Sequence, residues 1–349
     1  MCDAFLTLAY AEGGLSCFLV PRWLPDGERN AGFQVMRLKD KLGTRSMASG
    51  EVRLEGATAW LVGDPGAGFK QMADMVNNSR LSNAVRAAGM MRRAVSEALF
   101  ISRNREAFGR KLIDLPLMQR QLAKMMVWTE QARSAVFQAA DALRRADAGD
   151  DEGRRLLRVL TPLLKFRACR DARKVCGDAL EMRGGIGYIE EFATARLLRD
   201  SHLGSIWEGT SNIVALDVLR SVRKEDTLAV LDRHLARQLS EAQLPVALEA
   251  GFRGAWQRAR SLAATAAEPG NESLARQAAS ALYHVVSATA MAWEARRADA
   301  GRRLLLAQLV LRHRVLPGDP LAAARDDAGW LPQLLSEEAI AIDAVPALI

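Results

Sequence analysis

The sequence predicts a mostly α fold with a small β portion, in which a partial β-domain precedes an antiparallel four-helix bundle and a helical C-terminal extension. Three observations support this prediction. Short apolar runs separated by turn residues occupy residues 4–60, apolar residues then recur at helical spacing over three long stretches, and the chain after residue 224 is rich in Ala, Leu and Arg with further helical patterns. We therefore expect domains at residues 1–62, 63–223 and 224–349.

Four short strands are expected in the first domain. They are separated by turn residues such as Pro25-Asp26-Gly27, because Pro, Asp and Gly each favour a turn conformation. The strands are expected at Phe5–Tyr10, Cys17–Pro21, Phe33–Leu38 and Glu51–Leu54. Four strands with an open edge make an incomplete sheet, so the chain is expected to begin within a β-domain.

Long stretches of helical periodicity follow in the second domain. Bundle helices are expected at Phe69–Asn104, Leu115–Ala146 and Arg154–Met182, with a shorter one after Ser211. Their short connections predict antiparallel neighbours. In the extension, helical patterns lie around residues 226–239, 250–267, 272–299 and 300–314, with breaks at residues 269–271 and 317–320.

The composition excludes several classes of protein. Apolar residues make up 49% and charged residues 26% of the 349 residues, which is typical of a folded globular chain. The four cysteines form no CxxC pair and the four histidines are scattered, so neither a metal site nor a disulfide framework is expected. The N-terminus has no basic segment, and the longest uncharged stretch, residues 277–293, contains His, Gln and Ser. We expect no signal peptide, no membrane span and a cytoplasmic protein with reduced thiols.

A group of arginines near the end of the chain is a candidate contact for nucleic acid. The formal net charge is +7, and within this region only Glu294 and Asp299 oppose the basic residues. The group comprises Arg296, Arg297, Arg302, Arg303, Arg312 and Arg314. Such a group can face phosphates, although a solvated helix face gives the same pattern.

The stretch with the most chemical information lies between residues 183 and 213. It contains Arg-Gly-Gly-Ile-Gly-Tyr from Arg183 and, further on, Trp-Glu-Gly-Thr-Ser-Asn. Gly184 and Gly185 permit a turn with positive φ and a close approach of the backbone to a ligand. Glu208 lies directly before a helix whose N-cap is expected at Thr210 or Ser211. A carboxylate beside an aromatic residue in a partly dry site can act as a general base; a capping or salt-bridged glutamate is the alternative.

Together with Arg105-Glu106-Ala107-Phe108-Gly109, these motifs resemble the C-terminal domain of the acyl-CoA dehydrogenase flavoprotein family. The stretches from Leu38 to Gly43 and from Asp217 to Arg220 are similar to its AidB-like, alkylation-response branch, which carries a helical C-terminal extension. The resemblance implies FAD as cofactor and α,β-dehydrogenation of an acyl-CoA thioester, isovaleryl-CoA-like or other. It also implies a homo-tetramer or dimer and an electron-accepting flavoprotein as partner.

The resemblance also implies a role for individual residues. Glu208 matches the base that removes the α-proton, and Ser79 occupies the alternative position of that base in other branches. The residues implied in FAD binding are Arg105 and Phe108, which contact the cofactor of a neighbouring subunit, Gly184 and Gly185 beside its adenosine half, and Thr210 and Asn212. Arg80 matches a substrate-side arginine, whereas Asn77 replaces an Asp that straight-chain dehydrogenases often carry.

Nothing in the chain matches the N-terminal helical domain of the family or the first strands of its β-domain. We therefore expect a truncated dehydrogenase, in which one wall of the active site is missing. Two other functions stay open at this point. One is a DNA-associated protein of the AidB type that responds to alkylation damage with little dehydrogenase turnover, and the other is a structural subunit without chemistry.

Overall fold

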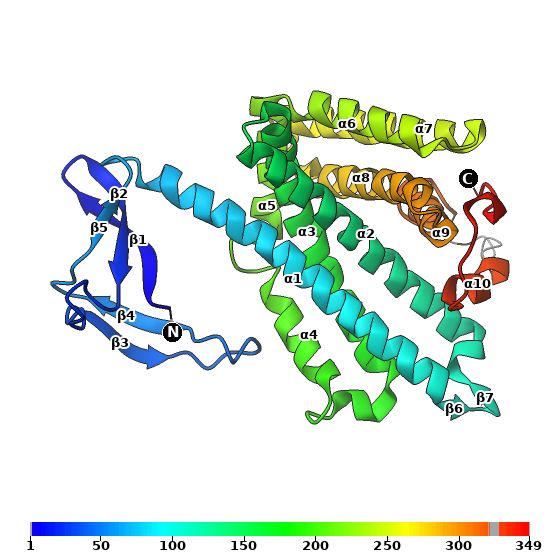
Figure 1. The fold of residues 1–349 in the computed structure, drawn as a ribbon, viewed down its shortest axis with the longest axis horizontal. Coiled ribbons are helices and arrows are strands. Elements are labelled where there is room, and N and C mark those ends of the chain that lie inside the picture. The colour runs from blue at the N-terminus through cyan, green and yellow to red at the C-terminus, as the bar shows by residue number, and fades with distance from the viewer. Residues whose placement is uncertain (1, 320, 322–327, 349) are drawn as a thin grey trace. The chain divides into compact units, whose positions relative to one another are not determined.

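The computed structural model describes residues 2–319, 321 and 328–348 and divides into two compact units, residues 1–80 and 81–349 (Figure 1). The predicted fold class is confirmed, because helices dominate and the sheets are small and antiparallel. The division lies inside the long helix α1 (Gly68–Asn104). Pro320, at the end of the second expected break, is outside the described residues.

The smaller unit holds two separate sheets rather than the single four-stranded sheet expected. Strands β1 (Ala4–Ala11), β2 (Gly14–Pro21) and β5 (Trp60–Val62) form one sheet, and β3 (Phe33–Leu38) pairs with β4 (Gly50–Leu54). The prediction failed to identify β5 because three residues are too few to show alternation. Buried Asn30, which lies between β2 and β3, joins the end of β2 to the segment between β4 and β5. Its Nδ2 donates to the carbonyl oxygens of Pro21 and Thr58 at 2.9 Å.

The bundle helices of the larger unit lie within a few residues of their predicted bounds. They are α1, α2 (Pro116–Asp147), α3 (Asp151–Met182) and α5 (Ser211–Glu225). Pro116 begins α2, where its missing N–H costs nothing, and Asp150 caps α3 by accepting from the backbone N–H groups of Glu152 and Gly153. Helix α4 (Ala193–Leu203), which has 11 residues, was not predicted from the sequence.

Helices of the extension follow the predicted pattern with two differences, since the last helix was not predicted and another changes its form near its end. They are α6 (Thr227–Ala242), α7 (Val246–Ala267), α8 (Ala275–Arg297), α9 (Gly301–Val310) and α10 (Leu331–Leu335). The helix expected at residues 300–314 changes after Val310 to the π-helical turn η4 (Leu311–Val315). A π-helical turn is rare and is frequently found at functional sites.

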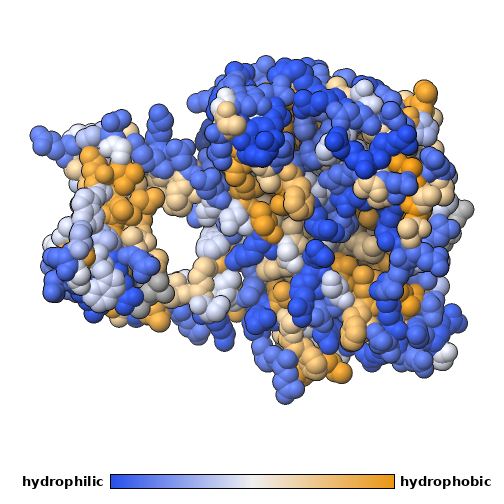
Figure 2. All heavy atoms as spheres, in the orientation of Figure 1, coloured by the Kyte–Doolittle hydropathy of each residue, from blue (hydrophilic) through white to orange (hydrophobic). Residues whose placement is uncertain are grey.

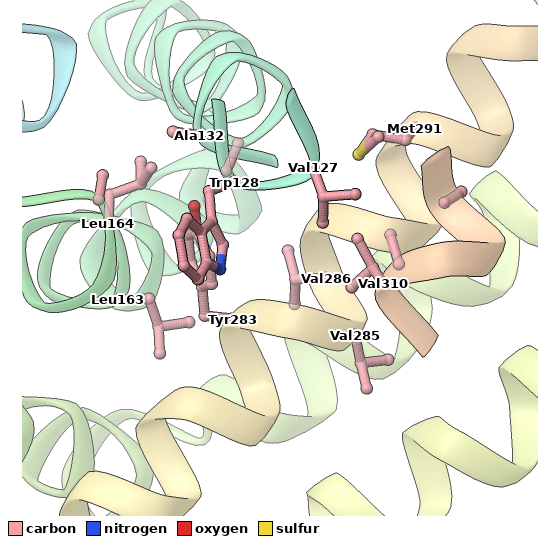
Figure 3. Packing of buried hydrophobic residues seen from close by; sticks show 14 of the residues in the cluster. Val127, Trp128, Ala132, Leu163, Leu164, Tyr283, Val285, Val286, Met291 and Val310 are labelled. Carbon is pink, nitrogen blue, oxygen red and sulfur yellow. The ribbon is translucent and has the colours of Figure 1, made fainter. Parts of the chain in front are cut away.

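One hydrophobic core joins the helices on both sides of residue 224. Helix α8 packs against α2, α3 and α5 of the bundle and against α6 and α7 of the extension. Figure 3 shows Trp128 of α2, Leu164 of α3 and Val286 of α8 converging in this core. The predicted boundary at residues 223 and 224 lies near the end of α5, and it stays a prediction.

Within the described residues, no helix is long and apolar enough to cross a membrane, and no cluster of three His, Cys, Asp or Glu side chains could hold a metal ion. All four cysteines are free, and Cys17, Cys169 and Cys176 are buried.

A buried histidine makes the stability of the helical unit depend on pH. Burial of His234 on α6, with the nearby Arg237 and Arg145 outweighing Glu152 and Asp141, lowers its pKa from 6.5 to about 4. Between these values the unfolded chain binds a proton that the folded chain does not, so stability rises with pH across this window and is lost on acidification.

We expect the free energy of unfolding to fall by about 3 kcal/mol through His234 as the pH drops from 7.5 to 4. The measurement is urea unfolding at a series of pH values for the wild type and His234→Leu. In the variant, the free energy of unfolding should lose the part of its pH dependence that comes from His234. It should still rise with pH to some extent, because burial also lowers the pKa of His284. Parallel curves for the two proteins would contradict the assignment.

Candidate functional site

Glu208 lies in a short turn between α4 and α5, with an unusual backbone conformation. We call residues 204–209 the Glu208 turn. Glu208 has a φ of 55° and Gly209 a φ of 97°, so two consecutive residues are left-handed. This conformation costs a non-glycine residue about 1 kcal/mol and persists only where the surroundings impose it. Such strain at a half-buried carboxylate is typical of a functional position.

A buried lysine holds both ends of the Glu208 turn. Lys165 of α3 is 2% exposed, and its Nζ donates to the carbonyl oxygen of Gly204 at 2.6 Å and to that of Gly209 at 3.0 Å. A buried ammonium requires such partners, because an unpaired charge in the interior is costly. Lys165 thus fixes the backbone on both sides of Glu208 from a rigid helix.

Helix α1 supports the same turn through Trp207. The indole Nε1 of Trp207 donates to Oδ1 of the buried Asn83, and the guanidinium of Arg86 lies 5.1 Å from the indole ring. On the other side, a Cβ atom at Gly204 would lie 3.2 Å from the Sγ of Cys169. Burial raises the pKa of Cys169 to about 11, so it remains a thiol and serves as packing. The turn therefore has little freedom.

The N-terminus of α5 directly follows Glu208. Thr210 is its N-cap, and within the described residues its exposed side chain makes no capping hydrogen bond. Asn212 is also exposed, whereas Ser211 Oγ accepts a hydrogen bond from Arg170 Nη1 at 3.3 Å. The first backbone N–H groups of a helix lack intrahelical partners, and together with these side chains they suit an anionic or hydroxyl-rich ligand.

The three glycines before α4 have different roles. In the turn η2 (Gly184–Tyr188), Gly184 has a φ of 66°, as the sequence predicts for one of the first two glycines. The close backbone approach lies instead at Gly187, where a Cβ atom would be 2.1 Å from the carbonyl oxygen of Leu180. A Cβ atom at Gly185 would have no described atom within 4 Å, so packing within this chain does not require a glycine at this position.

Arg105 and Phe108 belong to a small hairpin beside η2. Strands β6 (Glu106–Ala107) and β7 (Arg110–Lys111) are joined by Phe108, with a φ of 54°, and Gly109. Arg105 Nη1 donates to the carbonyl oxygen of Arg183 at 3.1 Å. Arg183 is in turn paired with Glu97 at 3.2 Å, which ties the end of α3 to α1. These contacts fix the direction of the Arg105 side chain.

Aromatic and apolar side chains surround this hairpin and η2 at the surface. Phe108 is 92% and Tyr188 is 80% exposed, and Ile186 and Ile189 are also exposed. Figure 2 shows hydrophobic surface on the part of the larger unit where α4 begins. Exposed aromatic side chains on a positive-φ turn favour a contact with a ligand or another chain.

The predicted site residues form two groups at opposite ends of α4 (Figure 1). Arg105, Phe108 and the η2 glycines lie before α4, and Glu208, Thr210 and Asn212 lie after it. A helix of 11 residues is about 16 Å long. Arg80 belongs to the smaller unit, where its Nη1 donates to Asn77 Oδ1 at 3.2 Å. The asparagine that replaces the expected Asp is therefore a partner of this arginine.

The six arginines proposed for nucleic acid are mostly engaged within the chain. Arg303 pairs with Glu130 and Glu294, and Arg297 pairs with Glu241. The others contact neutral groups: Arg296 donates to Gln243 Oε1, Arg302 to the carbonyl oxygens of Ser336 and Glu338, Arg312 to that of Leu348, and Arg314 lies over the Trp128 ring. These contacts favour a packing role over a common phosphate-facing surface.

Part of the helical region is similar to known proteins. Residues 66–223 match the family described as acyl-CoA dehydrogenase, C-terminal domain. AidB of Escherichia coli is 45% identical over 224 residues, which cover 64% of this chain and 41% of AidB. Acyl-CoA dehydrogenase family member 11 of Caenorhabditis elegans is 38% identical over 233 residues, which cover 66% of this chain and 38% of that protein. The chain thus spans less than half the length of these two relatives.

A solved structure extends the similarity into the last third of the chain. The crystal structure of Caenorhabditis elegans ACDH-11 in complex with C11-CoA superposes with a TM-score of 0.84 at 30% identity. The match covers 91% of this chain and 58% of that one. The helices after residue 224 are therefore part of a fold that this relative shares.

Several residues that hold the candidate site were not identified from the sequence. Lys165 interrupts the apolar run Leu163-Leu164-Lys165-Phe166, and a single lysine within such a run is a signal of a buried, paired charge. Asn83 and Arg183 gave no comparable signal, because their partners are distant in sequence.

Proposed function

We propose that this chain, whose residues 66–223 match the family described as acyl-CoA dehydrogenase, C-terminal domain, carries the base and part of the FAD site of an acyl-CoA dehydrogenase. The single observation that carries the proposal is the Glu208 turn. This turn carries the Glu208 carboxylate directly before the N-terminus of α5. Its backbone is strained at Glu208 and is held in place by the hydrogen bonds of Lys165 and Trp207. Rigid support of this kind is what a catalytic base requires.

The residues present fit the phosphate and adenosine parts of FAD. Arg105 has a fixed direction and further N–H donors beyond the one bound to Arg183, and a guanidinium fork suits a diphosphate. Gly185 is open where a side chain would stand in the way of a ligand. As the resemblance to the family implies, we propose that Arg105 and Phe108 contact the FAD of a second copy in a homodimer or homotetramer, while Thr210 and Asn212 contact the chain's own FAD.

In the proposed reaction, the Glu208 carboxylate takes the α-proton of an acyl-CoA thioester. Bound FAD would accept the β-hydrogen with its electron pair, which leaves a 2-enoyl-CoA. Lys165 fixes the carbonyl groups of Gly204 and Gly209 on either side of Glu208. We propose that the backbone N–H of Glu208 stabilises negative charge on the thioester oxygen as the proton leaves. Arg80 is proposed to lie on the substrate side.

The proposal of an acyl-CoA substrate is supported by the relative crystallised with C11-CoA. Chain length stays open, with isovaleryl-CoA as a first test compound. A flavoprotein is proposed as the electron acceptor, and a cytoplasmic location stays a prediction.

Arg105→Ala is expected to weaken FAD binding about tenfold to a hundredfold, because the variant loses a charge-assisted contact with phosphate. Flavin fluorescence during titration of the purified chain with FAD measures the dissociation constant. Arg92→Ala is the matched control, because Arg92 is an exposed arginine of α1, the helix that ends directly before Arg105. Equal affinity in the Arg105 and Arg92 variants would contradict the proposed role.

Neither alternative function gains support from a specific contact. The DNA-associated reading rests on six arginines that are mostly paired or packed within the chain, as described above. A purely structural role does not explain why a glutamate has a strained backbone in a turn that a buried ammonium holds at both ends.

A further inference from the structure

A cavity of about 630 Å³ lies among α2, α3, α9, η4 and α10. Its volume is within the range of small-molecule sites, which is about 300–1,000 Å³. None of its lining residues belongs to the Glu208 turn, to η2 or to the β6–β7 hairpin. The proposed dehydrogenase function therefore does not account for this cavity, to which both the bundle and the extension contribute side chains.

Three cations with no described ion pair of their own line the cavity. Arg120, Lys124 and Arg314, which we call the cation triad, make no ion pair or hydrogen bond with any side chain that the structure describes. Lys174, also in the lining, is paired with Asp178, and Glu181 is the other carboxylate.

Arg314 interacts with the buried carboxylate of Asp171, which also pairs with Arg167. Arg120 and Lys124 are exposed and have no described ion pair. Positive charge gathered in this way attracts an anion.

Two members of the triad are oriented by an aromatic side chain. The guanidinium carbon of Arg314 lies 4.6 Å, and Lys124 Nζ 5.1 Å, from the centre of the Trp128 ring. Such contacts hold a guanidinium over an indole without using its in-plane N–H donors, which stay available to a ligand. Burial lowers the pKa of Arg314 from 12.5, although an arginine remains charged at neutral pH. Arg314 also belongs to the π-helical turn η4.

Another part of the cavity wall is aliphatic, while Gln121 and His313 add polar groups to the lining. Val127, Leu309 and Leu331, which we call the aliphatic wall, come from α2, α9 and α10. In Figure 3, Val127 lies near Val310, which follows Leu309 in the chain. Among the described lining residues there is no Phe, Tyr or Trp, and His313 carries the one ring, so the lining offers a nucleobase little surface for stacking.

We propose that this cavity binds an organic anion with an aliphatic chain, whose carboxylate or phosphate head contacts the cation triad while its chain packs on the aliphatic wall. Both heads are anionic and accept hydrogen bonds, which are the two properties that the cation triad recognises. A guanidinium fork with two flanking cations suits a phosphate as well as a carboxylate.

Isothermal titration calorimetry of the full chain tests this proposal, with dodecanoate and dodecyl phosphate as probes below their micelle concentrations. We expect saturable binding of at least one probe and a dissociation constant about tenfold weaker in Arg314→Met. Lys124→Met should weaken binding as well, and it serves as the second variant if Arg314→Met fails to fold. Arg260→Met is the control, because Arg260 is an exposed arginine on α7 that does not line the cavity.

The comparison of probes decides the outcome. Tighter binding of one head identifies that head, and dodecyltrimethylammonium, which has the same chain and the opposite charge, should not bind. Binding of adenosine monophosphate in place of the alkyl probes would overturn the aliphatic part of the proposal. Absence of binding by either alkyl anion, or equal binding by wild type, Arg314→Met and Lys124→Met, would overturn the site itself.

Discussion

Glu208→Gln is expected to lower the rate of acyl-CoA dehydrogenation about a thousandfold or more, because the amide cannot accept the α-proton. The rate is measured anaerobically, as the loss of the oxidised flavin absorbance after an acyl-CoA is added. Glu208 is half-buried and its turn is held by Lys165 and Trp207, so the variant should keep the circular dichroism spectrum and melting temperature of the wild type.

The matched control is Glu191→Gln, which changes an exposed glutamate near the start of α4. It should keep the wild-type rate. A Glu208→Gln protein that binds FAD and bleaches as fast as the Glu191 variant would show that another group takes the proton.

Lys165→Met is expected to lower both stability and activity. It removes the donor that Gly204 and Gly209 share, while the methionine keeps the apolar stem in place. Hydrogen bonds from a charged donor contribute about 1.5–3 kcal/mol each, and relief of the buried charge offsets part of that. We expect the free energy of unfolding to fall by about 2 kcal/mol.

The activity of Lys165→Met should fall about a hundredfold, since displacement of a catalytic group by about 1 Å costs that much. Urea unfolding and the anaerobic bleaching rate measure the two effects. Lys224→Met, at an exposed lysine of α5, is the control for loss of a positive charge. Unchanged bleaching in a folded Lys165→Met protein would mean that the lysine does not position Glu208.

The sequence was informative where local patterns decide structure. Helical periodicity predicted α1, α2 and α3 to within a few residues, because each helix buries a continuous apolar face. The glycine-rich motif correctly placed a positive φ at Gly184. The positive φ of Glu208 was not predicted, because a glutamate has no intrinsic preference for that conformation.

Long-range contacts could not be predicted in this way. The clamp from Lys165 to Gly204 and Gly209 joins α3 to a turn about 40 residues later, and only tertiary packing reveals it. The arginines of the extension resembled a phosphate-binding group in sequence, but the partners of Arg303 are Glu130 and Glu294, of which the first is far away in the chain. Charge counts along the chain do not show such pairing.

The central claim is that this chain holds FAD beside Glu208 and uses that glutamate as a base. The most direct test is the absorbance spectrum of the purified chain saturated with FAD, recorded before and after anaerobic addition of isovaleryl-CoA and longer acyl-CoAs. The proposal predicts bound oxidised flavin whose absorbance is lost with at least one acyl-CoA and is retained in Glu208→Gln. A chain that binds no flavin, or bound flavin that no acyl-CoA reduces, would contradict it.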